Sequence, residues 1–500
     1  MDSEIELKLL VTADAESKIR EQFLPQLKAS IEHESVQLYN SYYDTPEHAL
    51  RQHGMGLRVR GNNGDYEQTI KSKDGSVGGL HKRAEHNVDI PSNQLDIALF
   101  PDGIWPEALN IEELKQQLTT LFSTHFRREQ YQIRLPDGSH VEMVFDSGEI
   151  ETDKYHTPVC EVELELKKGQ SDALFQLARQ LLDIIPFRLG YKSKAQRGYE
   201  LFLGEEAEMA HIRPEFKLGK EDSLQEAFII LMSELVQYWQ YYEQRFVELG
   251  KVRDIVELVA IMRLMKRNLK LFEKHLSCAE FSELSLQLKE QLKYWDWVDE
   301  LADIKELLSK KGFYRKKLQK QEVVMRHLQA RQTQLLEMHQ PLQLLHQSSY
   351  ARLQLNILEM LTHKPWTNAP LWQEESINRL AKKAIREELK SIFSLFHFET
   401  KESVKAYLKN LPALNKVVEI QTLLAGAVGN RTGQSLKTWT DLLDGAEELK
   451  VLHTLEKNLR KLFSEGEDSL IHWCVAKQES LLEVMELSRE AALLAQAEAL

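Results

Sequence analysis

The sequence predicts an α+β protein with two domains, a closed antiparallel eight-stranded β-barrel with a polar interior followed by an all-α helical bundle. Up to about residue 200, short runs alternate between polar and apolar residues, and their charged side chains share one face. Beyond Gly204 the alternation gives way to helical spacing. The chain of 500 residues is also longer than one ordinary domain, so at least two domains are expected.

Turn sequences such as Gly61–Asp65 and Pro136–Gly138 separate the alternating runs of the first part. Strands are predicted near residues 3–11, 36–44, 55–61, 65–72, 80–90, 126–135, 138–146 and 157–167. Helices are predicted near residues 12–24 and 171–184. Because so many antiparallel strands with charges on one face can close on themselves, we expect a barrel with a polar lumen.

The helical part begins at Ser223, which forms a capping-box pattern with Glu226. Further helices are predicted near residues 252–275, 280–307, 313–338, 342–362, 374–395, 400–409, 412–426, 434–442, 446–463 and 467–498. We therefore assign residues 1–204 to the first domain, 205–221 to a linker and 222–500 to the helical domain.

Carboxylates alternate with aliphatic residues along Glu161–Glu165 and again in Glu4-Ile5-Glu6. Residues two apart on a strand share a face and lie roughly 6–7 Å apart. Such a row of negative charges is costly unless a cation faces it, and a divalent metal with oxygen ligands is the simplest one. A half-buried strand with a solvated polar face would explain either run alone.

Basic residues alternate in the same way at Arg58 and Arg60, and Lys71 continues the series. The guanidinium group of arginine suits bidentate contact with phosphate oxygens, and lysine acts as a compact point charge. An interior lined by carboxylates on some strands and by cations on others matches a complex of polyphosphate with a metal ion. Without such guests, burial of these charges would be unfavourable.

Residues 1 to about 202 resemble the CYTH domains, also called triphosphate tunnel metalloenzymes. The matching blocks are Glu4-x-Glu6-x-Lys8, Tyr43-Asp44-Thr45, Leu57-Arg58-x-Arg60, Thr69-Ile70-Lys71, Leu80-His81-Lys82-Arg83-x-Glu85, Phe126-Arg127-Arg128, Val144-Phe145-Asp146-x-Gly148, Glu161–Lys167 and Ser193-Lys194-x-x-Arg197-Gly198-Tyr199. The central basic residue is either Arg127 or Arg128, and the position of Tyr131 favours Arg128.

The alternation and the resemblance together imply metal-assisted hydrolysis of a triphosphate, and the resemblance selects inorganic triphosphate, which would yield pyrophosphate and phosphate. The expected ligands of one or two Mg²⁺ or Mn²⁺ ions are Glu4, Glu6, Asp146, Glu161, Glu163 and Glu165. The expected catalytic cations, which would hold the anion, are Lys8, Arg58, Arg60, Lys71, Arg83, Arg128 and Lys194. A strongly perturbed pKa in the carboxylate cluster should favour activity at alkaline pH or high metal concentration. A class IV adenylate cyclase, another organic triphosphatase and a polyphosphate-binding module without turnover stay open.

The second half resembles the CHAD domains, helical modules that accompany CYTH domains and bind polyphosphate. The best block is Arg263–Phe272, with support from Leu288-Lys289 and Trp295, and from Ser349–Leu353 leading to Pro365-Trp366. Val256 and Val259 stand where the family has histidine and arginine, which predicts fewer phosphate contacts. The basic face of Arg263, Lys266 and Lys270 is either a polyphosphate site or a solvated helix face. The cluster Lys310–Lys317 is more typical of a surface patch than of a nucleic-acid site.

Composition excludes several other classes. The net charge of −13 argues against a general nucleic-acid binder. The three cysteines and 17 histidines lack the spacing of zinc ligands. With no signal peptide or long apolar stretch, the chain is expected to be soluble and cytoplasmic. Because every site residue precedes residue 200, the first domain is expected to be active alone.

Overall fold

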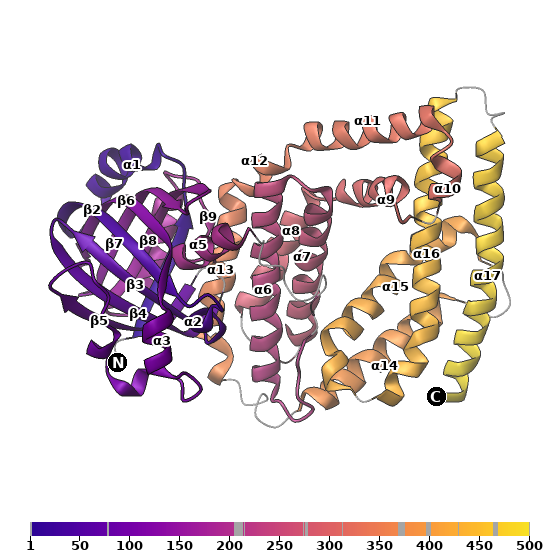
Figure 1. Cartoon of the computed structure of the whole chain (residues 1–500). Coiled ribbons are helices and arrows are strands. Elements are labelled where there is room, and N and C mark those ends of the chain that lie inside the picture. The colour runs from indigo at the N-terminus through magenta and orange to yellow at the C-terminus, as the bar shows by residue number, and fades with distance from the viewer. Residues whose placement is uncertain are drawn as a thin grey trace. The chain divides into compact units, whose positions relative to one another are not determined.

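The computed structural model describes residues 3–77, 80–204, 214, 216–273, 275, 279–312, 314–368, 376–396, 402–428, 430–463 and 469–499. Within these ranges it does not describe the side chains of residues 3–4, 73–77, 81–83, 102, 367–368, 393, 430–439 and 495–499. The chain divides into two compact units (Figure 1). Unit 1 comprises Met1–Ile212 and Leu345–His363, and unit 2 comprises Arg213–Leu344 and Lys364–Leu500.

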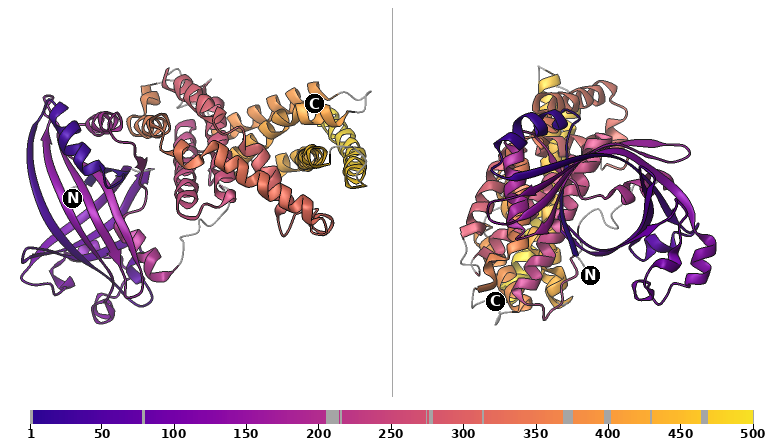
Figure 2. Two further views of the ribbon diagram at one scale, coloured as in Figure 1. Left: turned by 90° about the horizontal axis from the view of Figure 1, so that it is seen from above. Right: turned by 90° about the vertical axis from the view of Figure 1, so that its left-hand side faces the viewer.

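One antiparallel sheet forms the centre of unit 1. Its strands are β1 (Ser3–Leu10), β2 (Ser30–Asp44), β3 (Met55–Asn62), β4 (Asp65–Val77), β5 (Leu80–Ile90), β6 (Thr119–Arg134), β7 (His140–Glu151), β8 (His156–Lys168) and β9 (Arg188–Leu189). The order is β5-β4-β3-β2-β6-β7-β8-β1-β9, and β5 also pairs with β1. This additional pairing places Ser3–Leu7 opposite residues 80–84. Figure 2 shows how strongly the sheet curves.

The antiparallel sheet is confirmed, but the expected closed barrel of eight strands is wrong, because the sheet continues past β1 to a further strand, β9. Among the described residues there are nine, because Arg188 and Leu189 pair with Leu10 and Leu9 of β1. A strand of two residues is too short to show alternation in sequence. β2 and β6 also begin earlier than expected, at Ser30 and Thr119. In β2 the first residues are mostly exposed and so do not alternate in burial.

The two faces of the sheet have different environments. Leu7, Leu9, Val162 and Leu164 are fully buried on one face. Helix α4 (Asp172–Leu182) packs against β8 and contributes buried residues such as Leu174. The charged residues two positions apart on the same strands therefore share the opposite face.

Short helices complete unit 1. The helix expected near 12–24 is divided into α1 (Ala15–Lys18), a π-helical turn (Ile19–Phe23) and a 3₁₀ turn (Leu24–Gln26). Helix α4 confirms the second expected helix. Three further helices were not predicted: α2 (Ala49–Gln52), α3 (Ile111–Gln117) and α5 (Lys194–Leu203). Helix α5 packs against β6, β7 and β8 and so becomes part of the site described below.

Helix α13 (Ser348–His363) lies in the middle of the helical half of the sequence, yet it belongs to unit 1. It packs against α4. The guanidinium group of Arg179 on α4 donates hydrogen bonds to Asn356 at 3.0 Å and to both carboxylate oxygens of Glu359. The expected domain ranges therefore leave out one helix that contributes to the first unit.

Unit 2 is helical throughout its described part. Its helices are α6 (Leu224–Leu249), α7 (Val252–Glu273), α8 (Ala279–Lys293), α9 (Val298–Leu308), α10 (Arg315–Leu318), α11 (Glu322–His339), α12 (Pro341–Leu345), α14 (Ile377–Leu395), α15 (Val404–Leu424), α16 (Asn430–Leu462) and α17 (Ser469–Ala499). The predicted capping box of Ser223 and Glu226 is confirmed. No helix within the described ranges combines the length and apolar character needed to cross a membrane.

Two expected breaks in this unit are wrong. Helix α15 continues through Pro412, where buried residues on both sides, such as Leu411 and Leu414, stay in helical phase. Helix α16 continues through Gly445, where a Cβ atom would lie 2.8 Å from Cγ of Met485 on α17. The glycine therefore permits close packing of two helices instead of ending one.

The contact between α13 and α4 gives the first prediction. Arg179→Ala should lower the local free energy of unfolding of α4 by about 1–3 kcal/mol, since several charge-assisted hydrogen bonds are lost. Arg352→Ala is the matched control, because its ion pair with Asp183 is exposed (41% and 65% for the two side chains). It should cost about 0.5 kcal/mol or less. Native-state hydrogen exchange of the α4 amides measures both, and equal effects would contradict the assignment of α13 to unit 1.

Candidate active site

The register of the strands places the predicted site residues on one face. Asp146 on β7 pairs with Glu161 on β8 and with Arg128 on β6. Lys8 on β1 pairs with Glu163 on β8. Since directly opposed residues of an antiparallel pair project to the same side, these five side chains meet.

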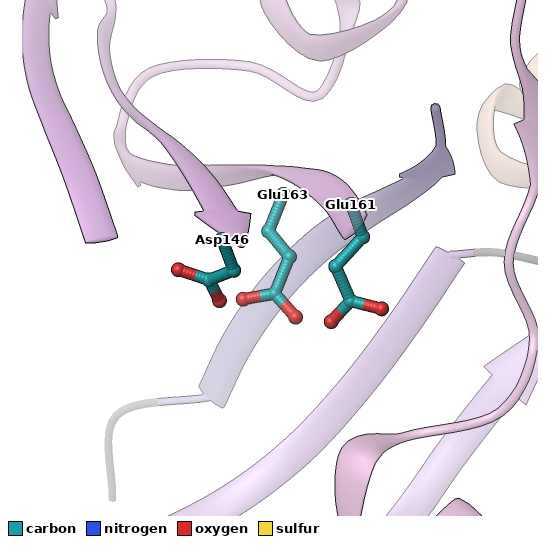
Figure 3. A group of neighbouring side chains, drawn as sticks. All are labelled: Asp146, Glu161 and Glu163. Atoms are coloured by element: carbon teal, nitrogen blue, oxygen red, sulfur yellow. The ribbon is translucent and has the colours of Figure 1, made fainter. Parts of the chain in front are cut away.

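Three carboxylates form the acidic cluster, defined as Asp146, Glu161 and Glu163 (Figure 3). One oxygen from each lies within 4.8 Å of the others. The side chains of Asp146 and Glu161 are fully buried, and Oε2 of Glu161 accepts no hydrogen bond. This oxygen lies 3.9 Å from Nη1 of Arg197. A buried carboxylate oxygen without a hydrogen bond beside two more carboxylates fits a divalent cation, which prefers oxygen ligands.

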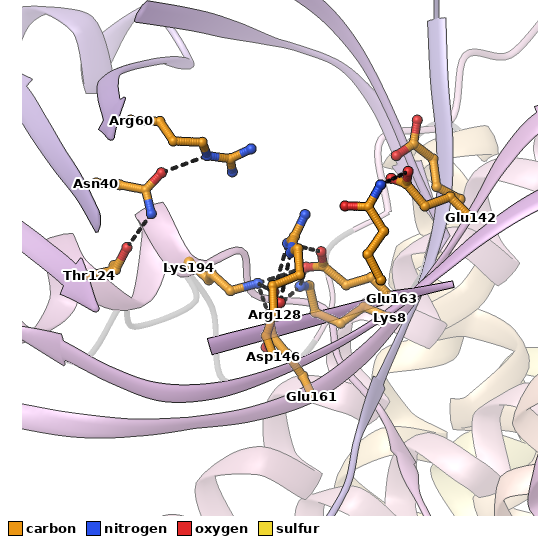
Figure 4. Close-up of polar contacts among 12 residues, drawn as sticks. Lys8, Asn40, Arg60, Thr124, Arg128, Glu142, Asp146, Glu161, Glu163 and Lys194 are labelled. Atoms are coloured by element: carbon orange, nitrogen blue, oxygen red, sulfur yellow. Dashed lines mark hydrogen bonds and ion pairs between the residues drawn. The ribbon is translucent and has the colours of Figure 1, made fainter. Parts of the chain in front are cut away.

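Three cations neutralise the acidic cluster (Figure 4). Nζ of Lys194 lies 2.6 Å from Asp146, 2.5 Å from Glu161 and 3.1 Å from Glu163. Arg128 donates two hydrogen bonds to Asp146, at 2.8 and 2.7 Å, and Lys8 contacts Glu161 at 2.7 Å and also Glu163. Arg128 thus lies at the centre of the site, whereas Arg127 is half-exposed and pairs with Glu16 and Glu129.

The charges of this cluster shift each other's pKa. Burial favours the neutral form of Glu163, but Lys194 and Lys8 outweigh burial and hold its pKa well below the usual value. Burial opposes ionisation of Asp146 as well, and Arg128 and Lys194 lower its pKa overall. The perturbed pKa values expected from the sequence therefore exist, but their downward direction gives no basis for a preference for alkaline pH.

Helix α5 carries Lys194 into the acidic cluster. Its N-cap residue Ser193 accepts a hydrogen bond from the backbone N–H of Gln196 at 3.1 Å, so the helix begins at Lys194. Gly198 lets the helix approach β6, because a Cβ atom there would lie 2.0 Å from Cε2 of Phe122. A cation in the first turn of a helix is normally unfavourable, and the three carboxylates offset this cost.

A second group of predicted cations lies on β3 and β4, and we call it the arginine group: Arg58, Arg60 and Lys71. Lys71 and Arg58 lie 2.9 and 3.5 Å from the carboxylate of Glu85. Nε of Arg60 donates to Oδ1 of Asn40 at 2.9 Å. Burial and the neighbouring guanidinium groups of Arg58 and Arg128 lower the pKa of Arg60 to about 9. An anion bound beside these groups would relieve their mutual repulsion.

The remaining predicted residues are placed differently. Glu6 is buried and pairs in register with Glu165, outside the acidic cluster. Glu165 contacts Lys167, and burial raises its pKa. The side chains of Glu4 and Arg83 lie outside the described residues, although the backbone register pairs the two positions.

Sequence reasoning missed several residues at the site. Glu85 belongs to a recognised block but was not assigned a role, and Asn40 and Thr124 are neutral residues with no charge pattern to reveal them. All three lie on strands that carry predicted site residues or pair with them. Asn40 and Tyr42 are two residues apart on β2 and so share a face. Only this spacing could have suggested that Asn40 lies on the charged face.

In unit 2, the predicted basic face of α7 is partly neutralised. Arg263 pairs with Asp299 at 2.8 Å, and the adjacent Arg267 pairs with Glu419 at 2.7 Å. Burial, followed by repulsion from Arg267, lowers the pKa of Lys266. The other basic cluster, Lys310–Lys317, is largely exposed, and its Phe313 lies outside the described residues.

The lowered pKa values predict a pH dependence of stability in the metal-free protein. A carboxylate with a depressed folded-state pKa stabilises the fold above its unfolded pKa, and this is lost as pH falls through the folded value. Glu163→Gln should therefore lower the melting temperature most at pH 7, and the difference from wild type should shrink below about pH 4. The exposed Glu107→Gln is the control and should show no such trend. A difference for Glu163→Gln that is constant from pH 7 to pH 3 would contradict the ion pairing.

Comparisons with known proteins find similarities to parts of this chain. Over 205 residues this chain is 34% identical to the inorganic triphosphatase of Haemophilus influenzae. The match covers 40% of this chain and 55% of that protein. This chain therefore matches only about half the length of that relative. A protein from Hippeastrum with a dominant triphosphatase activity covers 42% of this chain and 99% of its own, with 18% identity and a TM-score of 0.29. The CHAD domain from Ricinus communis covers 58% of this chain and 98% of its own, with 16% identity and a TM-score of 0.41. Residues 2–199 match the model of the CYTH domain. This part of the chain is therefore a CYTH domain.

Proposed function

We propose that unit 1 hydrolyses inorganic triphosphate to pyrophosphate and phosphate with the help of Mg²⁺ or Mn²⁺. The observation that carries this proposal is the meeting of an acidic cluster and an arginine group on one face of a strongly curved sheet. The first group suits a metal ion, and the second suits a phosphate chain that the curved sheet would surround as a tunnel. The similarity of this part to an inorganic triphosphatase supports the same substrate.

Asp146, Glu161 and Glu163 would hold the metal ion, with Glu4, Glu6 and Glu165 as further ligands. Their carboxylate oxygens match the preference of Mg²⁺ and Mn²⁺, and Oε2 of Glu161, which is buried and accepts no hydrogen bond, is well suited to this role. When bound, the ion would neutralise phosphate charge and make a coordinated water more acidic.

The cations of the chain would bind and orient the substrate. Arg58, Arg60 and Lys71 would hold the phosphate chain in place, together with Arg83. Arg128 and Lys194 would stabilise the charge that develops on the transferred phosphoryl group. Lys8 is buried and bonded to Glu161 and Glu163, so its role would be to fix those carboxylates. A carboxylate of the cluster would accept the proton of the attacking water.

A phosphate-release assay on the full chain tests the substrate class. Tripolyphosphate should be hydrolysed faster than thiamine triphosphate, ATP or pyrophosphate in the presence of Mg²⁺ or Mn²⁺, and EDTA should stop the reaction. Formation of cyclic AMP and pyrophosphate from ATP would instead support a class IV adenylate cyclase. Tight binding of tripolyphosphate without turnover would support a binding module.

Removal of one carboxylate tests the acidic cluster. Glu161→Gln should lower kcat by roughly 100-fold or more, because even outer partners of metal ligands often cost 10–100-fold. Glu129→Gln is the matched control: Glu129 is also a buried, ion-paired carboxylate (6% exposed), but it belongs to the other face of β6. Its variant should keep wild-type kinetics. Equal activity of the two variants would contradict the proposed metal site.

Replacement of Arg60 by lysine tests the arginine group. Arg60→Lys should raise KM for tripolyphosphate and lower kcat, with kcat/KM reduced about 10-fold or more, since lysine cannot replace a planar, bidentate donor. Arg134→Lys serves as the control, because Arg134 is half-exposed and pairs with Glu32. Wild-type kinetics in Arg60→Lys would show that the guanidinium group does not contact substrate.

Three further expectations stay predictions. We propose a cytoplasmic location. We also propose that polyphosphate, if it binds to the helical unit, binds at the α7 face around Lys266. We also propose that residues 1–204 contain every catalytic group, with residues 345–363 needed for the stability of the unit.

A further inference from the structure

Two buried neutral residues lie behind the arginine group. Asn40 on β2 and Thr124 on β6 are both fully buried. They are directly opposed in the register of these two strands, and Nδ2 of Asn40 donates to Oγ1 of Thr124 at 2.9 Å. Asn40 is also directly opposed to Arg60 on β3 and accepts the 2.9 Å hydrogen bond from its Nε. The three side chains thus form one continuous chain of hydrogen bonds across three strands (Figure 4).

The chemistry of the three groups fixes the direction of this chain. A guanidinium group can only donate, so the oxygen of the Asn40 amide must face Arg60. The amide nitrogen must then face Thr124, whose hydroxyl oxygen can accept. Loss of the Thr124 hydroxyl would leave a fully buried amide nitrogen unpaired, so that only the hydrogen bond with Arg60 would hold this amide orientation.

The neutrality of Asn40 is the second part of the observation. Lys8, Arg128 and Lys194 are all held by carboxylates of the acidic cluster, which balance their charges. Among the described residues, Arg60 has no carboxylate within ion-pair distance, and its hydrogen bond partner Asn40 carries no charge. Its terminal nitrogens are turned away from Asn40 in Figure 4. Arg60 is thus oriented by a neutral hydrogen-bond partner, although Glu67 on β4 is directly opposed to it in the register.

We propose that Asn40 and Thr124 are positioning residues for Arg60, holding its Nε so that the two terminal nitrogens and their positive charge are presented to a phosphate group. This inference rests on the proposed triphosphatase function and deepens it. The role of Thr124 is indirect, because its side chain is hydrogen-bonded to Asn40 and acts through the orientation of that amide. Burial and the guanidinium groups of Arg58 and Arg128 lower the pKa of Arg60 more than Tyr42 and Glu67 raise it.

The test is the binding of tripolyphosphate to the metal-free full chain, measured by isothermal titration calorimetry in EDTA at pH 7. Thr124→Val removes the hydroxyl with little change in shape and should weaken binding about 3- to 10-fold, as expected for one lost hydrogen bond. Thr124→Ser keeps the hydroxyl and should bind within about 2-fold of wild type. In an Arg60→Ala background, Thr124→Val should cause no further loss, because the effect passes through Arg60. A loss of equal size in that background would overturn the proposal.

Asn40→Asp tests the neutrality of the partner and is nearly isosteric, so it serves if Thr124→Val does not fold. The new carboxylate keeps an acceptor for Nε but balances the charge of Arg60, so binding should weaken about 10-fold or more. Wild-type affinity in Asn40→Asp would overturn the proposal. If the wild-type chain itself binds no tripolyphosphate, the proposed function fails and this inference fails with it. If wild type binds and neither variant differs from it, only the positioning role is rejected.

Discussion

The ion pairs between Lys194 and the acidic cluster are the interaction on which the site depends. Asp146, Glu161 and Glu163 lie too close together to stay ionised in a buried place without a cation among them. The ammonium group of Lys194 contacts all three, and it reaches them only because helix α5 packs tightly onto β6 through Gly198. The same contacts therefore connect β7, β8 and α5, so the electrostatics of the site and the packing of this helix are inseparable.

The two groups of charges on the sheet are balanced in different ways. On β1, β6, β7 and β8, cations and carboxylates form ion pairs, and the pKa values of Asp146 and Glu163 are lowered. On β3 the guanidinium of Arg60 has a neutral amide partner. A metal ion competes with resident cations at the first group, whereas an anion at the second meets a guanidinium group whose hydrogen-bond partner is neutral. The sheet therefore separates the two kinds of ligand by the partners that it gives to its own side chains.

The sequence predicted the parts of this structure that repeat with a period of two. Charges at every second residue of β1 and β8 identified both strands and the face that they share. The pattern could not reveal β9, which has two residues, or Asn40, which has no charge. It also could not predict that α13 packs with α4, because contacts between segments so distant along the chain leave no local signal. The breaks expected at Pro412 and Gly445 are wrong because tertiary packing in helical phase overrides local propensity.

The membership of α13 in unit 1 has a consequence for synthesis of the chain. Unit 1 consists of Met1–Ile212 and Leu345–His363, so its last helix is translated only after much of unit 2. At ordinary translation speeds, roughly 8–30 s separate the appearance of Ile212 from that of His363. During that interval the face of α4 that α13 covers has no partner from its own unit. The packing of unit 1 is therefore complete only when the ribosome has passed the middle of the helical half.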